Sequence, residues 1–162
     1  MAQERALVED TRQKAGRHEA KNLGWSAMGL TVVRHQLEVG DYALMPRCSV
    51  DTKQDIQELY SDVVHDHERF RRECDRAVEV GCQLIILTEN AHGVRSLADL
   101  EAWVEPEAEF RRRRRAKERI SGLSLARACR TLAERHGVWF AFCAPEEAAR
   151  AVLDLLEDYE RR

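Results

Sequence analysis

The sequence lacks any segment long and apolar enough to enter a membrane. No stretch of about 18 apolar residues occurs in it, and this excludes a membrane-spanning helix. The N-terminal segment carries Glu4, Glu9 and Asp10 where a secretory signal peptide would have its apolar core. We therefore expect a cytoplasmic protein with no membrane partner.

Closely paired cysteines are also absent. The five cysteines are Cys48, Cys74, Cys82, Cys129 and Cys143. None belongs to a C-x-x-C motif, and four lie in segments with an apolar pattern. Structural zinc sites and disulfide frameworks depend on regularly spaced pairs. The sequence therefore predicts buried free thiols rather than a zinc protein or a disulfide-stabilised secreted protein.

Repeats, linkers and low-complexity tracts are missing too, apart from one run of arginines. The chain has 162 residues, 44% of them hydrophobic and 34% charged, so it can bury a core without disulfides. We expect a single domain over residues 1–162. The formal net charge of −3 argues against a protein that coats nucleic acid indiscriminately.

What the sequence does contain is an alternation of strand and helix patterns. Alternating or continuous apolar residues predict strands at 6–10, 31–37, 41–45, 48–53, 83–87 and 138–143. Apolar residues three and four apart predict helices at 17–28, 54–80, 97–104 and 125–133, and a last helix from Pro145 onward. The continuous apolar run at 83–87 is typical of an inner strand covered on both faces. These patterns predict an α/β fold with a mixed central sheet flanked by helices on both sides.

Two aspartates and a lysine have the spacing that a divalent-metal nuclease needs. Asp41 follows a glycine, and Asp51 and Lys53 lie on the next predicted strand, where alternation puts them on one face. Mg²⁺, for which Mn²⁺ can substitute, needs only one or two protein carboxylates, so Asp41 and Asp51 are enough. Asp10, at the end of the first predicted strand, adds a third acid. Each aspartate alone is more commonly a turn residue, but their combination indicates a metal site.

The chemistry of such a site follows from charge. Phosphodiester hydrolysis gathers negative charge in the transition state, so the site must supply positive charge there. A metal ion would do this and would lower the pKa of a bound water. Lys53 could orient or deprotonate that water or stabilise the phosphate. Arg12, two residues after Asp10 and so expected on the same strand face, could pair with the acids or hold the phosphate. The sequence leaves these roles and the number of metal ions open.

The motifs resemble those of the XPF-type (ERCC4 domain) nucleases of the PD-(D/E)XK superfamily. In that family an Asp-x-Arg-Glu strand precedes Gly-Asp and then Glu-Arg-Lys. This chain has, in the same order and at matching intervals, Asp10-Thr11-Arg12-Gln13, Gly40-Asp41-Tyr42 and Asp51-Thr52-Lys53. The chain further resembles the stand-alone versions of this domain found in bacteria and their phages, at residues 66–70, 84–89, 121–122 and 136–143. The chain departs from the family pattern in two motifs: Gln13 replaces a frequent glutamate, and Asp51-Thr52 replaces Glu-Arg.

The resemblance implies a restriction-endonuclease-like fold and a Mg²⁺-dependent DNA endonuclease that cuts branched or flapped DNA in recombination, repair or replication. It implies Asp10, Arg12, Asp41, Asp51 and Lys53 as catalytic residues, with the three aspartates as metal ligands. We expect no helix-hairpin-helix module, so DNA binding would fall to this domain, a homodimer of it or a partner subunit. Two alternatives stay open: a non-catalytic DNA-binding scaffold, and a resolvase or RNA-processing nuclease of the same superfamily.

A block of positive charge follows a block of acids in the second half of the chain. The acids are Glu101, Glu105, Glu107 and Glu109. Adjacent cations repel one another and call for phosphates or an acidic partner, although a solvated helix face or a loop is the alternative. Because the chain also contains the metal motif, we interpret the cations as DNA-binding residues: Arg111, Arg112, Arg113, Arg114, Arg115 and Lys117. In keeping with the resemblance, His67 and Arg69 on the predicted helix 54–80 are interpreted as facing the DNA, with a plain surface role as the alternative.

Overall fold

The computed structural model describes residues 6–14, 19–45 and 47–162. Its strands are β1 (Ala6–Glu9), β2 (Thr31–Arg34), β3 (Tyr42–Met45), β4 (Cys48–Lys53), β5 (Gln83–Glu89) and β6 (Trp139–Cys143). They form one sheet of six strands in the order β2-β1-β3-β4-β5-β6. The sheet is mixed, because β3 runs antiparallel to both of its neighbours while the other neighbouring strands pair in parallel.

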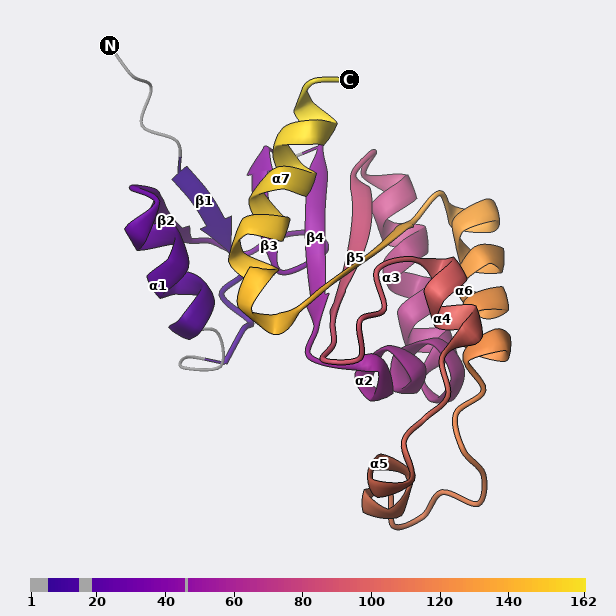
Figure 1. Cartoon of the computed structure of the whole chain (residues 1–162). Coiled ribbons are helices and arrows are strands. Elements are labelled where there is room, and N and C mark those ends of the chain that lie inside the picture. The colour runs from indigo at the N-terminus through magenta and orange to yellow at the C-terminus, as the bar shows by residue number, and fades with distance from the viewer. Residues whose placement is uncertain (1–5, 15–18, 46) are drawn as a thin grey trace.

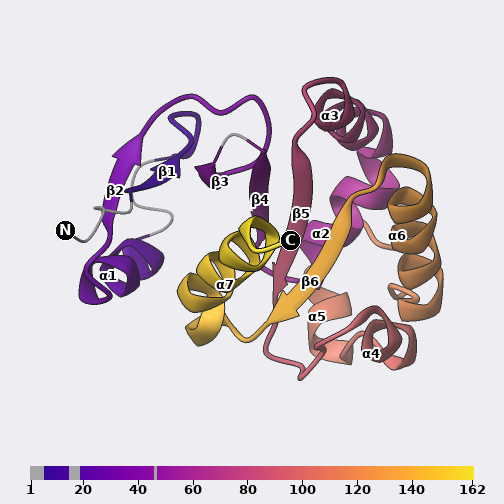
Figure 2. The same ribbon diagram turned by 90° about the horizontal axis from the view of Figure 1, so that it is seen from above.

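Helices cover both faces of this sheet (Figures 1 and 2). One face carries α1 (Glu19–Ala27) and α7 (Ala148–Glu160), and the other carries α2 (Ile56–Tyr60), α3 (His67–Glu79), α4 (Leu97–Ala102) and α6 (Gly122–His136). Side chains of β5 alternate between the two cores: Leu84 and Ile86 pack with α3 and α6, whereas Ile85 and Leu87 pack with α7. The predicted α/β class and the doubly covered inner strand are confirmed. Among the described residues, no helix has the length and apolar character needed to cross a membrane.

The single helix predicted over 54–80 is wrong, because the structure divides it into three pieces. α2 ends at Tyr60, a π-helical turn follows at Ser61–His65, and α3 begins at His67. The N–H of Asp66 donates to the carbonyl of Ser61 at 2.8 Å, the wide spacing of a π-helical turn. All three pieces bury apolar side chains in one core, and therefore the apolar spacing does not reveal the interruption.

Other predicted boundaries move by a few residues. β2 ends at Arg34 rather than at residue 37, and a 3₁₀ turn at Pro145–Glu147 precedes α7. α6 ends against Gly137, whose φ of +66° provides the expected left-handed cap. The predicted start of the first helix at Arg17 and the turn residue Pro46 lie outside the described residues.

An arm, residues 105–120, projects from the molecule between α4 and α6 (Figure 1). A β-bridge between Val104 and Ser121 closes its base, and it contains the short helix α5 (Glu107–Arg112). Gly122 begins α6 so close to α4 that a Cβ there would lie 2.2 Å from the carbonyl oxygen of Leu100. Glycine is therefore required where the chain returns from the arm.

Candidate active site

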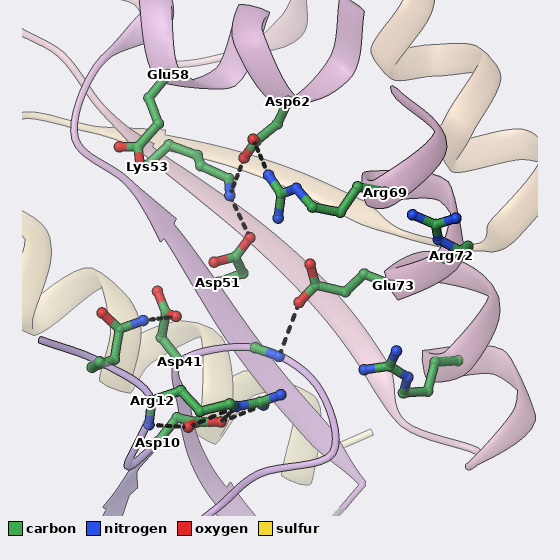
Figure 3. A pocket seen from close by; sticks show the side chains of 13 residues that line it. Asp10, Arg12, Asp41, Asp51, Lys53, Glu58, Asp62, Arg69, Arg72 and Glu73 are labelled. Carbon is green, nitrogen blue, oxygen red and sulfur yellow. Dashed lines mark hydrogen bonds and ion pairs between the residues drawn. The ribbon is translucent and has the colours of Figure 1, made fainter. Parts of the chain in front are cut away.

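An open cleft of about 490 Å³ lies between the ends of three strands and α3 (Figure 3). The residues that line it come from the ends of β1, β3 and β4, from α2 and the π-helical turn, and from α3. They are Asp10, Arg12, Gln13, Gly40, Asp41, Asp51, Lys53, Glu58, Asp62, Arg69, Arg72, Glu73 and Arg76. Apart from Gln13 and Gly40, every one of these residues is charged.

Antiparallel pairing brings the motif aspartates together. The N–H of Asp10, just after β1, donates to the carbonyl of Asp41 at 2.8 Å, and the N–H of Asp41 donates to the carbonyl of Val50 on β4 at 2.8 Å. Gly40 permits this approach, because its φ is +75° and a Cβ there would lie 2.7 Å from Oγ of Ser49. The Gly-Asp dipeptide of the motif thus has a structural cause in the close packing of this loop on β4.

Asp41 is buried and held from two sides. Its Oδ2 accepts hydrogen bonds from the N–H and the Oγ1 of Thr52, both at 2.8 Å, and its Oδ1 accepts one from the side-chain amide of Gln13. Burial and the negative charge of Asp51 raise the pKa of Asp41 well above its ordinary value, although the hydrogen bonds from Thr52 oppose them. Each departure from the family motif therefore includes a residue that binds the Asp41 carboxylate, Gln13 in the first and Thr52 in the second.

Lys53 lies between two carboxylates. Its Nζ is 2.7 Å from Oδ2 of Asp51 and 2.5 Å from Oδ2 of Asp62, and Oδ1 of Asp62 accepts a hydrogen bond from Arg69 at 2.6 Å. Asp51 and Lys53 share one face of β4, as predicted, while Val50 packs in the core on the other face. Burial lowers the pKa of Lys53, but the charges of Asp51 and Asp62 outweigh burial and raise the pKa above its ordinary value.

Arg12 does not lie on a strand face, contrary to the prediction, because β1 ends at Glu9 and Arg12 belongs to the turn that follows. The turn folds its guanidinium onto Asp10, with N···O distances of 2.5–3.0 Å. Burial raises the pKa of Asp10, but the hydrogen bonds from Arg12 and from the Leu37 amide outweigh burial and hold the pKa below its ordinary value. The predicted pairing of Arg12 with an acid is confirmed, and the role of Asp10 as a third metal ligand stays a prediction.

Three acids of the cleft were missing from the predicted site: Glu58 of α2, Asp62 of the π-helical turn and Glu73 of α3. Glu73 reaches the cleft from α3, where burial and the charge of Asp51 raise its pKa. It lies one helical turn after Arg69 and shares a face with it, so the charged face of this helix could have indicated it. No sequence pattern indicated Asp62. The π-helical turn sets the direction of its side chain, and the spacing of apolar residues does not reveal that turn.

The predicted DNA-binding residues divide between the cleft and the rest of the surface. Arg69 lines the cleft, together with Arg72 and Arg76 of the same helix. His67, although on α3, is not among the residues that line it. The arm cations lie outside the cleft as well: Arg111, Arg112, Arg113, Arg114, Arg115 and Lys117.

The arginine run is not a uniform cationic segment, because the arm folds two of its members against the preceding acids. Nε of Arg111 is 2.7 Å from Oε1 of Glu107. Arg113 forms a bidentate pair with Glu105, at 2.7 and 2.6 Å, and Glu105 is completely buried. Arg113 is therefore a structural residue of the arm, and its predicted contact with DNA would require this pair to open.

No family model and no curated protein matches the sequence. Among solved structures, XPF from Aeropyrum pernix aligns with a TM-score of 0.63 at 18% identity, over 97% of this chain and 62% of that chain. XPF from Aeropyrum pernix in complex with DNA aligns with a TM-score of 0.65 at 18% identity, over 96% of this chain and 65% of that chain. This chain thus spans less than two thirds of the length of those structures. It has the XPF-type nuclease fold that its motifs predict.

Proposed function

We propose that the protein is a metal-dependent endonuclease that hydrolyses phosphodiester bonds in DNA. The observation that carries the proposal is the burial of Asp41 and Asp51 as neighbours in an open, charged cleft, with Lys53 beside them. Burial first, and then repulsion by the Asp51 carboxylate, raise the pKa of Asp41. Such an arrangement suits the binding of a cation better than it suits the stability of the fold.

The donor set fits a hard divalent cation. Asp41 and Asp51 offer the carboxylate oxygens that Mg²⁺ and Mn²⁺ prefer, and the open cleft has room for water and phosphate oxygens. Across the described ranges no three His, Cys, Asp or Glu side chains form a ready-made cage, which agrees with the habit of Mg²⁺ to keep several waters. When bound, the ion would polarise the phosphate and lower the pKa of a water.

The cations of the chain supply the remaining positive charge. Lys53 is held at Asp51 by its second partner, Asp62, so its ammonium has a fixed place next to the metal-binding carboxylates. A preorganised charge of this kind stabilises a transition state without moving to do so. Arg12 and Arg69 also line the cleft and are about half exposed, and they are suited to hold the phosphates on either side of the bond that is cut.

DNA is the nucleic acid that the comparisons favour, since one of the two XPF structures of the same fold is a complex with DNA. The finer assignment, to branched or flapped DNA in recombination, repair or replication, rests on the motif resemblance. The expectation that a second copy of the chain or a partner subunit helps to bind DNA rests on the same resemblance. Both belong to the proposal and are open to the same assays.

Cleavage of a substrate panel tests the activity. Flap, fork, four-way, duplex and single-stranded DNAs, with RNA counterparts, are incubated with the protein in Mg²⁺ or in EDTA. We expect cleavage only with the metal, and we expect Asp51→Asn to lower the rate by orders of magnitude with little change in DNA affinity. The matched control is Asp154→Asn, which removes a carboxylate of α7 paired with Arg150.

The outcomes separate the alternatives. A wild-type rate in Asp51→Asn would exclude this cleft as the active site. Tight DNA binding by the wild type without any cleavage of the panel would favour the scaffold alternative. Cleavage of RNA in preference to DNA would favour an RNA-processing nuclease.

Thermal melting tests the metal without an activity assay. Asp41→Asn removes one of two repelling charges, so the metal-free variant should melt at a higher temperature than the wild type. A millimolar addition of Mg²⁺ or Mn²⁺ should raise the melting temperature of the wild type and leave that of Asp41→Asn unchanged. A metal-induced increase that persists in Asp41→Asn, as in the Asp154→Asn control, would place the ion elsewhere.

A further inference from the structure

A second hollow, of about 570 Å³, lies between the π-helical turn and the arm; we name it the arm groove. One wall is formed by Tyr60, Ser61 and His65, and the other by Arg113, Arg115, Ala116, Lys117 and Glu118. It shares no lining residue with the catalytic cleft. The π-helical turn nevertheless borders both hollows, because Asp62 lines the cleft while Ser61 and His65 line the groove.

The wall on the π-helical turn is aromatic. The ring centroids of Tyr60 and His65 lie 5.0 Å apart with an interplanar angle of 89°. The guanidinium of Arg113 lies 5.8 Å from the Tyr60 ring, and Arg113 is itself fixed by the buried Glu105. Tyr60 is half-buried and His65 exposed, so Tyr60 supports His65 from behind while the imidazole faces solvent.

The wall on the arm is cationic, and its charges are available. Arg111 and Arg113 are paired with carboxylates. Arg115 and Lys117, in contrast, are exposed and form no ion pair within the part of the chain that the structure describes. Glu118 also lines the groove, and the two unpaired cations outweigh it. The groove therefore combines an aromatic surface with positive charge, the pairing that single-stranded nucleic acids bind through their bases and phosphates.

We propose that the arm groove binds an unpaired strand of the nucleic-acid substrate, with a base against His65 and the adjoining phosphates on Arg115 and Lys117. The proposal rests on the nuclease function above. Contact with an aromatic side chain requires an unstacked base, which a continuous duplex does not present. The groove thus favours substrates that carry a single-stranded segment next to the bond that is cut, and a strand leaving the cleft needs only to cross the π-helical turn to reach it.

Equilibrium binding tests the groove independently of cleavage. Protein with Asp51→Asn is titrated, at one salt concentration, with a fluorescent oligothymidylate, a blunt duplex, and the same duplex with a single-stranded tail. In this background His65→Ala, and separately Arg115→Ala with Lys117→Ala, should weaken binding of the oligothymidylate and the tailed duplex about tenfold. Binding of the blunt duplex should be nearly unchanged, and His65→Phe, which keeps an aromatic ring, should retain the affinity of the parent.

The matched control is Arg150→Ala with Arg161→Ala, which removes two charges in α7 and at its end and no side chain from the groove. Equal losses in the two double variants would reduce the effect to general charge and overturn the proposal, as would equal losses on tailed and blunt duplexes. Melting curves confirm that each variant is folded. If the wild type cuts no nucleic acid but the groove variants still lose single-strand binding, the nuclease proposal fails and the groove stands. If the wild type cuts and the groove variants bind normally, the groove proposal alone fails.

Discussion

Asp62 contacts Lys53 on the side away from Asp51. Its Oδ2 is 2.5 Å from Lys53 and its Oδ1 is 2.6 Å from Arg69, so one carboxylate fixes two cations of the cleft. Asp62 is placed to act through Lys53, because its oxygens are taken up by these two partners. It is therefore expected to be a positioning residue, which holds the ammonium where the phosphate would meet it.

Asp62→Asn tests this expectation. The amide keeps the shape of the side chain but replaces one accepting oxygen with a donor, which cannot face a cation. We expect the cleavage rate to fall by about 10- to 100-fold, the cost of misplacing a catalytic group, with DNA affinity nearly unchanged. The matched control is Asp66→Asn, because Asp66 lies 3.7 Å from Arg69, is exposed, and makes no ion pair with Lys53 among the described contacts. A wild-type rate in Asp62→Asn would show that Lys53 needs no such support.

The cysteines give a pH-dependent prediction at the same scale. All five are free, as predicted, and four are buried, whereas Cys82 is only half-buried. Burial raises the pKa of Cys48, Cys74, Cys129 and Cys143 to about 12 and that of Cys82 to about 11. Because the thiolate is the reactive form, a raised pKa lowers reactivity at every pH below it. The native protein should react slowly with a thiol reagent at neutral pH and faster as the pH approaches about 11.

Denaturant provides the control for this measurement. Unfolding returns thiol pKa values to about 8.5, so all five cysteines should then react quickly at mildly alkaline pH. Rapid labelling of the native protein at neutral pH would contradict the burial that the structure gives these side chains.

Among the secondary-structure elements, β4 and the segment 54–80 show what sequence patterns can and cannot predict. The period of a strand is fixed, so alternation was enough to place Asp51 and Lys53 on one face of β4. The helical pattern over 54–80 failed because a π-helical turn at Ser61–His65 preserves the burial of apolar residues while redirecting polar ones. Asp62 and His65 both lie in that turn, and therefore the direction of neither side chain could be predicted.

The arm gives a prediction at the scale of an element. Arg113 is the partner of the completely buried Glu105, which also accepts a hydrogen bond from the N–H of Ile120 at 2.8 Å. Arg113→Ala leaves this carboxylate buried without its cation, so the free energy of unfolding should fall by about 3 kcal/mol, the lower end of the usual cost of breaking a buried ion pair. Arg114→Ala, at the exposed neighbouring position, should change it by no more than about 0.5 kcal/mol. Equal effects in urea unfolding would show that the Glu105 pair does not anchor the arm.

Over the whole molecule, strand order explains how residues distant in sequence share one cleft. β3 pairs antiparallel with both β1 and β4, so the end of β1, the start of β3 and the end of β4 meet at one edge of the sheet. Strands can be predicted from local patterns, but their order depends on contacts between distant segments. The motif resemblance predicted a shared site for Asp10, Asp41 and Asp51, but the strand order that brings them together was not predicted.

Charge on the molecule as a whole is negative, yet the arm presents cations to solvent. If these contact the DNA backbone, each contact releases counterions, and its loss should flatten the slope of log affinity against log salt by about 0.7–0.9 units. Arg113 must be spared, since it anchors the arm. Changing Arg112, Arg114 and Arg115 to alanine in the Asp51→Asn protein should therefore lower affinity and reduce the slope by up to about 2–3 units, about equally for different sequences of one DNA shape.

The control for that variant removes the same charge from the opposite side of the sheet. This control replaces three arginines in α7 and at its end by alanine: Arg150, Arg161 and Arg162. The net charge changes by the same amount as in the arm variant, so any long-range electrostatic effect on DNA affinity should be equal in the two proteins. Direct phosphate contacts add a loss that only the arm variant shows, because counterions are released locally. Slopes that agree between the arm variant and this control would mean that the arm remains solvated and that the path of the DNA follows Arg69, Arg72 and Arg76 along the cleft instead.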